Sequence, residues 1–375
     1  MSDDIRKTPG APSDNAPDAP KSGSGGMTLD RRDLLKGLAT VPVLGVLAFE
    51  VGRKKGVEDT RKNEVLKELG LEKKAPAAVK TTGKKGDMIR VGIIGYGGRG
   101  ENVVRAAGFA HPDWVESQKQ AEKASGSTQL KDYLEQEDIN ISIAGVCDVF
   151  DIRAERAIAA SKNEVRPGGG SRPPVEAERF LTYQDMLASP NIDAVIIATP
   201  EHQHAQMVID AMNAGKHVYC EKPMTKTFDE IALVEQAVRA SGKVYQLGHQ
   251  NRQVESHIKA REIIEKNILG KITLIETTTN RNNPNGAWVM SIHKDASPEN
   301  IDWKQFIFNA PRTAFNLERF FRWRCWYDYG NGLTGDLLSH EFDAVNQIMH
   351  CGIPKTAAAS GGIYYYKDGR EVPDV

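Results

Sequence analysis

The sequence predicts an α/β fold in which short buried strands alternate with helices in one doubly wound, mostly parallel sheet. Two observations carry this prediction. Apolar runs at residues 90–94, 194–199 and 217–220 are each followed by a helical pattern. Each run also stops at a glycine, proline or charged residue, as strands buried on both faces do where they meet a loop. Strands arranged in this way are joined by helical crossovers.

Length and composition exclude several other classes of protein. The chain has 375 residues, enough for two domains with a sizeable core. Its 49 basic and 50 acidic residues give a net charge of −1, which leaves no broad positive field to bind nucleic acid. Its four cysteines contain no C-x-x-C pair, so neither a disulfide scaffold nor a cysteine zinc site is expected. No apolar run reaches the roughly 18 residues of a membrane-spanning helix.

Residues 1–52 are interpreted as a disordered n-region followed by a twin-arginine-type export signal. The Arg31-Arg32 pair precedes a short apolar stretch at 37–49. We therefore expect the protein to be exported by the twin-arginine machinery and to be periplasmic, or anchored in the membrane and facing the periplasm. The alternative interpretation is a short amphipathic helix. Residues 53–86, rich in lysine and glutamate, are expected to be a linker.

A glycine-rich turn follows the first strand directly and has the pattern G-x-G-x-x-G. Its residues are Gly95, Tyr96, Gly97, Gly98, Arg99 and Gly100. Between a strand and a helix, this pattern is typical of a turn that lets the backbone approach the pyrophosphate of a dinucleotide. Residues 87–248 are therefore predicted to form a Rossmann domain that binds NAD. A glycine turn without a ligand is the alternative.

Asp148 is expected to bind the ribose hydroxyls of the cofactor. It stands at the end of the second predicted strand, 141–148, as the acidic residue of this fold does. The long distance from the glycine turn indicates an insertion of surface helix at 111–137. A carboxylate there repels a 2′-phosphate, so NAD is favoured over NADP, although Arg153 close behind it opposes that preference.

The next two strands end in polar loops that are predicted to border the same cofactor. Ligands of doubly wound sheets bind beyond the carboxyl ends of the strands. The residues at those ends are Thr199, Pro200, His204, Glu221 and Lys222. His204 is expected to support the cofactor loop.

Four motifs in this order resemble one family, the Gfo/Idh/MocA oxidoreductases (glucose–fructose oxidoreductase and inositol dehydrogenase). They are the glycine turn, Ala198-Thr199-Pro200, Glu221-Lys222-Pro223 and the Asp-x-x-x-His pattern of residues 336–340. The resemblance covers residue 88 to the chain end. It implies a substrate-binding α/β domain at 249–375, with a helix at 255–266 and an open, mostly antiparallel sheet that includes strands at 271–279 and 362–366. This sheet looks incomplete, so we expect a truncated chain and a possible homo-oligomer formed through it.

The resemblance also implies catalytic roles. Lys222 corresponds to the residue beside the nicotinamide, where a lysine of lowered pKa can take part in proton transfer. His340 corresponds to the acid/base on the substrate hydroxyl, and Asp336 to a substrate-binding residue that assists it. The i, i+4 spacing puts these two on one helix face. A helix cap with a surface histidine is the alternative. A metal site is not expected, because the histidines 202, 204, 249 and 340 lack an H-E-x-x-H spacing.

An aromatic and arginine-rich run at 319–329 lies between these motifs. Aromatic faces and arginine donors suit a sugar ring, but core packing explains the run equally well. Gln250 and Arg252, in the turn that joins the domains, are further candidates to reach the cleft.

Together these features predict an NAD(P)-dependent oxidoreductase that moves a hydride between nicotinamide and a hydroxyl-bearing carbon of a sugar or polyol. Two alternatives remain open. One is a glycoside hydrolase that uses transient oxidation on the same scaffold, and the other is a non-catalytic protein that binds sugar or nucleotide.

Overall fold

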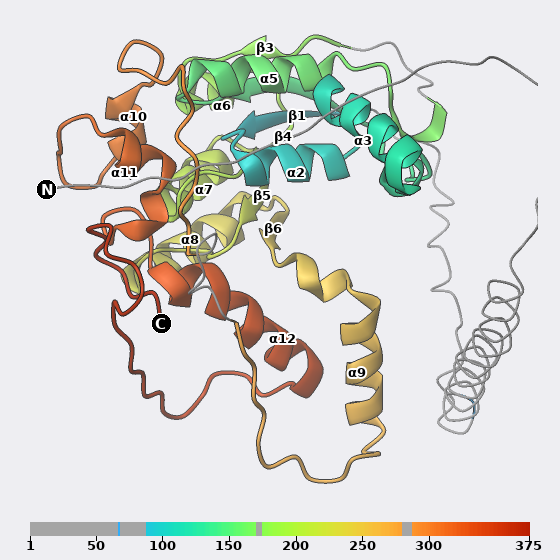
Figure 1. The fold of residues 1–375 in the computed structure, drawn as a ribbon, viewed down its shortest axis with the longest axis vertical. Coiled ribbons are helices and arrows are strands. Elements are labelled where there is room, and N and C mark those ends of the chain that lie inside the picture. The colour runs from blue at the N-terminus through green and yellow to red at the C-terminus, as the bar shows by residue number, and fades with distance from the viewer. Residues whose placement is uncertain (1–66, 68–87, 170–174, 280–286) are drawn as a thin grey trace, which may run out of the picture. The chain divides into compact units, whose positions relative to one another are not determined.

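The computed structural model describes residues 67, 88–169, 175–279 and 287–375 (Figure 1). All the elements discussed below lie in one compact unit, Thr81–Val375. The predicted export signal at 1–52 lies outside the described residues, and so does the predicted linker at 53–86 except for residue 67. Within the described part of the chain, every helix is too short or too polar to cross a membrane.

Six parallel strands form the central sheet in the order β3-β2-β1-β4-β5-β6. They are β1 (Ile89–Ile94), β2 (Ile141–Cys147), β3 (Glu178–Arg179), β4 (Ala194–Ile197), β5 (His217–Glu221) and β6 (Tyr245–Gly248). This is the strand order of the doubly wound dinucleotide-binding fold. The order reverses between β1 and β4, so the crossovers leave a crevice at the carboxyl ends of these two strands.

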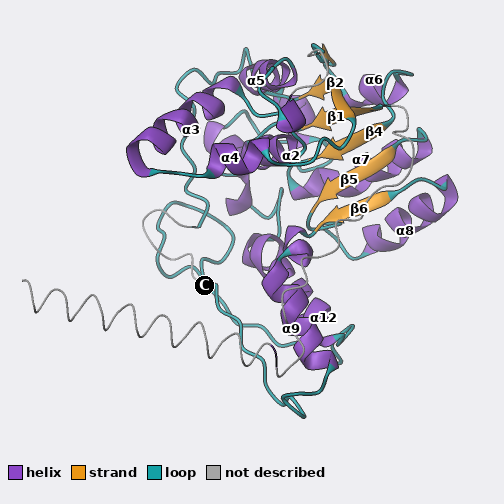
Figure 2. Ribbon diagram, turned by 90° about the vertical axis from the view of Figure 1, so that its right-hand side faces the viewer, coloured by secondary structure: helices purple, strands orange, loops and turns teal. Residues whose placement is uncertain are grey.

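Helices cover both faces of the sheet, which confirms the predicted Rossmann architecture (Figure 2). Helices α2 (Gly98–Ala106) and α5 (Asp151–Ser161) pack on one face, where small alanines of α5 allow close contact with the strands. Helices α6 (Tyr183–Ala188), α7 (Glu201–Asn213) and α8 (Asp229–Ser241) pack on the other. Because β1 is buried on both faces, its apolar run does not alternate with polar residues.

The insertion predicted in the first crossover is helical. Helix α3 (Pro112–Ser125) begins at a proline after His111, whose Nδ1 accepts the backbone N–H of Asp113 at 3.1 Å. A left-handed Gly126 ends it, as glycine commonly does at a helix C-terminus. Helix α4 (Gln129–Leu134) follows and packs against it around a small core of its own.

The antiparallel sheet expected within 249–375 does not form among the described residues. This region contains α9 (Glu255–Glu265), α10 (Trp303–Ile307), α11 (Leu317–Phe321), a π-helical turn (Thr334–Leu338) and α12 (Ser339–Met349). Helices α9 and α12 pack side by side (Figure 1). The predicted helix at 255–266 is therefore confirmed, whereas the strands at 271–279 and 362–366 were wrong.

Residues 271–279 and 362–366 have the composition of strands but form no ladder with a neighbouring strand. A strand needs a neighbour to satisfy its backbone N–H and C=O groups, and a lone strand is not stable in water. No described segment forms a strand ladder with either stretch. In 362–366 the backbone bonds to another segment are those of Gly362 with Asp374 and Val375. Leu274 and Tyr364 lie 73% and 68% exposed. The sheet through which a homo-oligomer was predicted to form is therefore absent from the described part of the chain, and the homo-oligomer itself stays a prediction.

Candidate active site

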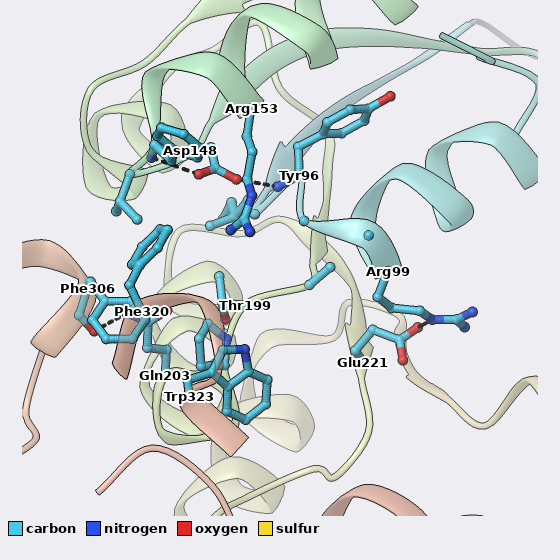
Figure 3. Close-up of a pocket in the computed structure, with 18 of the residues that line it drawn as sticks. Tyr96, Arg99, Asp148, Arg153, Thr199, Gln203, Glu221, Phe306, Phe320 and Trp323 are labelled. Atoms are coloured by element: carbon cyan, nitrogen blue, oxygen red, sulfur yellow. Dashed lines mark hydrogen bonds and ion pairs between the residues drawn. The ribbon is translucent and has the colours of Figure 1, made fainter. Parts of the chain in front are cut away.

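A cavity of about 1340 Å³ opens at the carboxyl ends of β1, β2, β4 and β5. The glycine turn and the loops that follow the other three strands form one wall. Residues of α10, α11 and the π-helical turn form the opposite wall. Figure 3 shows Phe306, Phe320 and Trp323 facing Tyr96, Asp148 and Thr199 across this space. This volume exceeds that of an ordinary small-molecule pocket, which is roughly 300–1,000 Å³.

The glycine turn has the geometry that close approach of a dinucleotide requires. Gly95 adopts φ +86°, and a Cβ there would lie 2.8 Å from the carbonyl oxygen of Ala198. A Cβ on Gly100 would collide with the carbonyl oxygen of Gly95, so glycine is needed for α2 to pack against β1. No side chain among the described residues caps the first turn of α2. Its N–H groups and its dipole are therefore available to an anion.

Asp148 lies at the end of β2, as expected, but its carboxylate holds the protein backbone. Oδ2 accepts the N–H of Tyr96 at 2.6 Å, and Oδ1 accepts the N–H of Phe150 at 2.8 Å. The residue is buried, and burial raises its pKa although Arg153 and the two N–H groups oppose the shift. Asp148 thus fixes the glycine turn, and any contact with a ribose hydroxyl would use its remaining lone pairs.

Arg153 projects from α5 into the centre of the cavity (Figure 3). Its guanidinium lies over the rings of Phe150, Phe320 and Phe321, with centroid distances of 5.3–5.6 Å. Nη1 lies 3.8 Å from the position that a Cβ on Gly97 would occupy. The guanidinium forms no ion pair with any described carboxylate, so a cation faces the place where the glycine turn admits a phosphate.

The loops after β4 and β5 are tied together by His204. Its Nδ1 lies 2.7 Å from the carbonyl oxygen of Pro223, and its Nε2 lies 2.9 Å from that of Thr199. Burial lowers the pKa of His204, and the contacts of the ring with the carbonyls of Pro223 and Thr199 oppose this shift. The ring thus joins two loops that border the cavity, and its role in supporting a cofactor loop stays a prediction.

Glu221, the last residue of β5, is held by two side chains. The phenol of Tyr219 donates to Oε1 at 2.8 Å, and Nε of Arg99 lies 2.8 Å from the same oxygen. Figure 3 shows this ion pair linking the glycine turn to the end of β5. Arg99 also donates to Oε1 of Gln250 at 3.3 Å, so Gln250 reaches the cavity wall as predicted. Arg252 instead pairs with Asp343 of α12 at 2.6 Å.

Lys222 and Asp336 come together across 114 residues of sequence. Nζ of Lys222 donates to Oδ1 of Asp336 at 2.9 Å and also to its backbone carbonyl. Nε of Arg324 lies 3.0 Å from the same carboxylate, and the indole of Trp288 donates to Oδ2 at 2.7 Å. Burial alone would raise the pKa of Asp336, but the two cations outweigh it and hold that pKa well below its ordinary value.

His340 follows in the first turn of α12, beside the same cluster. The π-helical turn Thr334–Leu338 carries Asp336, and such turns recur at functional sites. Burial lowers the pKa of His340, and the nearby charges of Lys222 and His249 lower it further. Its Nδ1 has no hydrogen-bond partner among the described residues. The three side chains predicted as catalytic thus lie in one cluster at the cavity wall, with His340 neutral.

The sequence left two interpretations open for the aromatic run at 319–329, namely core packing and a wall of the binding site. The structure places some of its residues in the core and others at the cavity. Its buried members belong to an aromatic core with Phe150 and Phe306, and they are Phe320, Phe321, Cys325, Trp326 and Tyr329. Trp323 and Arg324 face the cavity instead. The run therefore builds both the core of this region and one wall of the site.

No three histidine, cysteine, aspartate or glutamate side chains come together as a metal site would require, within the residues that the structure describes. His202 contacts the carbonyl oxygen of Phe306 at 2.9 Å, and His249 lies 3.8 Å from Asp343. These histidines serve packing and hydrogen bonding.

Sequence reasoning missed two residues of the site. Trp288 donates to Asp336 from a loop with no motif, and only the fold brings it there. Glu201, immediately after Pro200, is 2% exposed and lines the cavity. A charged residue at the first position of a helix is ordinarily explained by the helix dipole, so the sequence carried no signal for a buried role.

The strand order, the glycine turn and the cavity at the carboxyl ends of the strands together define a Rossmann fold of the dinucleotide-binding type. Residues 89–249 match the model of the GFO_IDH_MocA family, which is described as an oxidoreductase family with an NAD-binding Rossmann fold. This match covers the sheet, the glycine turn and the Lys222 loop.

Three curated proteins show how the chain relates to this family. The uncharacterized oxidoreductase YrbE of Bacillus subtilis is 30% identical over 48% of this chain and 42% of its own length. The levoglucosan dehydrogenase of Pseudarthrobacter phenanthrenivorans is 28% identical over 48% of this chain and 41% of its own. A glycosyl hydrolase family 109 protein of a Shewanella species is 32% identical over 39% and 25%. The chain thus spans less than half the length of each of these relatives.

Proposed function

We propose that the protein is an NAD(P)-dependent oxidoreductase that transfers a hydride between nicotinamide and a hydroxyl-bearing carbon of a sugar or cyclitol. The observation that carries this proposal is the single cavity that runs from the glycine turn to the cluster of Lys222, Asp336 and His340. A relative named as a levoglucosan dehydrogenase supports the sugar class.

The residues present fit a nicotinamide dinucleotide. The uncapped start of α2, the close approach at the glycine turn and the free guanidinium of Arg153 suit the phosphates. The loops after β4 and β5, with Thr199 and Glu221, would border the nicotinamide end. When bound, the nicotinamide accepts or supplies the hydride.

The protein's own residues would handle the proton. Oxidation of a secondary alcohol gives a ketone, a hydride and a proton, and the proton needs an acceptor at the hydroxyl oxygen. His340 suits this role because it lines the cavity and its pKa is lowered by burial and by the nearby charges of Lys222 and His249, which favours the neutral imidazole that can accept a proton. The Lys222 ammonium, held by Asp336, would orient the same oxygen and stabilise the developing alkoxide.

NAD is proposed as the preferred cofactor, with NADP bound more weakly. The Asp148 carboxylate at the end of β2 supports this preference, because it disfavours an additional phosphate near the ribose. The positive charge of Arg153 opposes this preference, because it favours an additional phosphate. Dissociation constants of the two nucleotides test the preference directly, and equal affinities would contradict it.

A panel of sugars and polyols, with nucleotide reduction followed by absorbance, tests the proposed activity. We expect reduction of NAD with at least one sugar or cyclitol, and loss of that activity in Lys222→Ala. The same activity in the variant and the wild type would contradict the assigned site.

Similarity to a glycosyl hydrolase family 109 protein favours a second candidate. In that case the bound nucleotide would oxidise a sugar transiently, so that its glycosidic bond is eliminated before the sugar is reduced again. A chromogenic glycoside distinguishes the two, because such a hydrolase releases the leaving group with no net change in nucleotide absorbance.

Export by the twin-arginine pathway is proposed as well, and the Arg31-Arg32 pair ahead of an apolar stretch supports it. Residues 1–52 fused to a reporter should direct it to the periplasm, and a double change of both arginines to lysine should stop this. Export of a redox enzyme calls for a tightly held cofactor, so purified protein should retain nucleotide.

A further inference from the structure

Glu201 is a buried carboxyl that none of the assigned roles uses. It begins α7 directly after Pro200 and is 2% exposed at the cavity wall. Its Oε2 accepts the backbone N–H of Asn331 at 2.8 Å. Its Oε1 has no hydrogen-bond partner among the described residues. One hydrogen bond is too little to offset the burial of a full negative charge.

The loop on which Glu201 acts is the one that carries Asp336. A Cβ on Gly335 would lie 2.7 Å from Oε2 of Glu201, and a Cβ on Gly330 would lie 3.4 Å from its Cδ. Glycine at 335 therefore lets this loop close directly over the carboxyl, whereas a Cβ at 330 would touch Glu201 at ordinary contact distance and would collide first with Trp323, at 2.9 Å. Through Asn331, Glu201 joins the end of β4 to the segment that presents Asp336 to Lys222.

The cations near Glu201 form their ion pairs with Asp336 and not with Glu201. Three charged groups face Glu201 from neighbouring elements, and they are Asp336, Arg324 and Lys222. Arg324 and Lys222 both form ion pairs with Asp336, at 3.0 and 2.9 Å, and neither pairs with Glu201. On α7 itself, His202 and His204 have pKa values lowered by burial and supply no cation. Two carboxyls in one site thus have opposite environments, which separates their protonation states.

We propose that Glu201 is a positioning residue that stays protonated beside the ionised Asp336 and fixes the 330–335 loop, so that Asp336 meets Lys222. This role rests on the proposed oxidoreductase site, but the protonation and the loop contact are properties of the folded chain alone. The proton resides on Oε1, because Oε2 accepts from Asn331. A neutral Glu201 spares the cluster a second negative charge.

The pKa of Glu201 supports this arrangement. Burial raises it from the ordinary 4.5 to about 7, and the nearby negative charge of Asp336 adds to the shift against the opposing effect of Asn331, Arg324 and Lys222. A raised pKa in the folded state stabilises the fold below the ordinary value. That contribution is lost as pH rises from 4.5 toward 7.

Three variants test the proposal in the full chain. Glu201→Gln mimics the protonated carboxyl, Glu201→Ala removes the contact, and Glu235→Gln is the matched control on exposed α8, where Glu235 pairs with Arg239. Thermal unfolding is measured between pH 4.5 and pH 8. We expect the Tm of E201Q relative to wild type to increase across this interval, while E235Q runs parallel to wild type. Parallel curves for E201Q would overturn the protonated state.

Hydrogen exchange of the 330–335 loop tests the positioning role without any substrate. We expect exchange at the Asn331 amide to speed up at least tenfold in E201A and to stay near the wild-type rate in E201Q, because an amide oxygen still accepts that N–H. Equal rates in all variants would overturn the role. If E201A does not fold, slow exchange in E201Q together with its Tm profile still decides the question.

Activity gives an independent result. In a substrate-active preparation, E201Q should rescue most of the kcat that E201A loses and should remove the fall in kcat as pH rises through 7. If no sugar is turned over while the Tm and exchange results hold, the proposed function fails and Glu201 stands as a protonated loop anchor.

Discussion

The ammonium of Lys222 lies 2.9 Å from Oδ1 of Asp336, and this contact joins the end of the parallel sheet to a π-helical turn 114 residues later. Both side chains are nearly buried, at 9% and 13% exposure. Because Arg324 pairs with the same carboxylate, the contact is one centre of a compact charge cluster. The stability of the protein and its chemistry should therefore depend on the same residues.

Asp336→Asn should destabilise the protein by about 3 kcal/mol at neutral pH, because it leaves the nearly buried ammonium of Lys222 and the partly buried guanidinium of Arg324 without their counter-ion. The folded-state pKa of Asp336 is depressed, so its contribution is present above the ordinary carboxyl pKa of 3.8 and is lost as pH falls below it. Denaturant unfolding at several pH values measures this. Asp193→Asn, which breaks a more exposed pair with Arg90, should cost far less, and similar losses in both variants would contradict the prediction.

His340→Ala should lower kcat by a factor of about 100 or more, the usual contribution of a positioned acid/base group. The pKa of His340 is lowered from 6.5 by burial and nearby cations. Oxidation by the wild type should therefore rise with pH through a midpoint below 6.5 and fall again only as Glu201 ionises, at about pH 7. A pH profile of kcat/KM provides the measurement, and an unchanged acid limb in the variant would exclude His340 as the base.

Arg153→Gln should weaken the affinity for NAD and NADP alike, by about tenfold, since a charged hydrogen bond to phosphate contributes roughly 1.5 kcal/mol or more. The guanidinium lies next to Gly97 of the glycine turn, where the proposed site would hold the pyrophosphate of either nucleotide. Equilibrium titrations at two salt concentrations provide the test. Arg105→Gln, on the outer side of α2 near Trp114, is the matched control and should bind normally. A loss of affinity for NADP alone would indicate that Arg153 contacts the 2′-phosphate instead of the pyrophosphate.

Gly100→Ala should abolish nucleotide binding and destabilise the domain, because a Cβ collides with the carbonyl of Gly95 and pushes α2 away from the turn. Gly126→Ala provides the comparison, since it strains a left-handed glycine at the end of α3 far from the cavity. Thermal unfolding and nucleotide titration together separate the two effects. Normal affinity in Gly100→Ala would show that the turn does not hold the cofactor.

The features that were predicted best from the sequence are those that depend on residues close together in the chain. The strand at 90–94 and the glycine turn are a local pattern, and both lie where expected. The cluster of Lys222, Asp336 and His340 was predicted only through motifs, because contacts across 114 residues have no local signature. The residues 271–279 have strand composition, yet pairing decides whether a strand forms, and composition carries no information on pairing.

Other parts of the site could not be predicted for an electrostatic reason. Asp148 was expected to face the ribose, but its oxygens satisfy two backbone N–H groups that become buried only in the fold. Glu201 resembled an ordinary acidic helix start, and its burial depends on a loop that closes over it from residues 330–335. Burial and partner identity arise from the three-dimensional arrangement.

The single extra residue in the π-helical turn makes the register of this region sensitive to chain length. Removing one residue between Thr334 and Leu338 would leave an ordinary α-helix, and each residue of such a helix turns by roughly 100°. Asp336 and His340 would then rotate relative to each other, and the carboxylate would leave Lys222. A one-codon deletion at this place can therefore separate two neighbouring groups that a substitution would leave side by side.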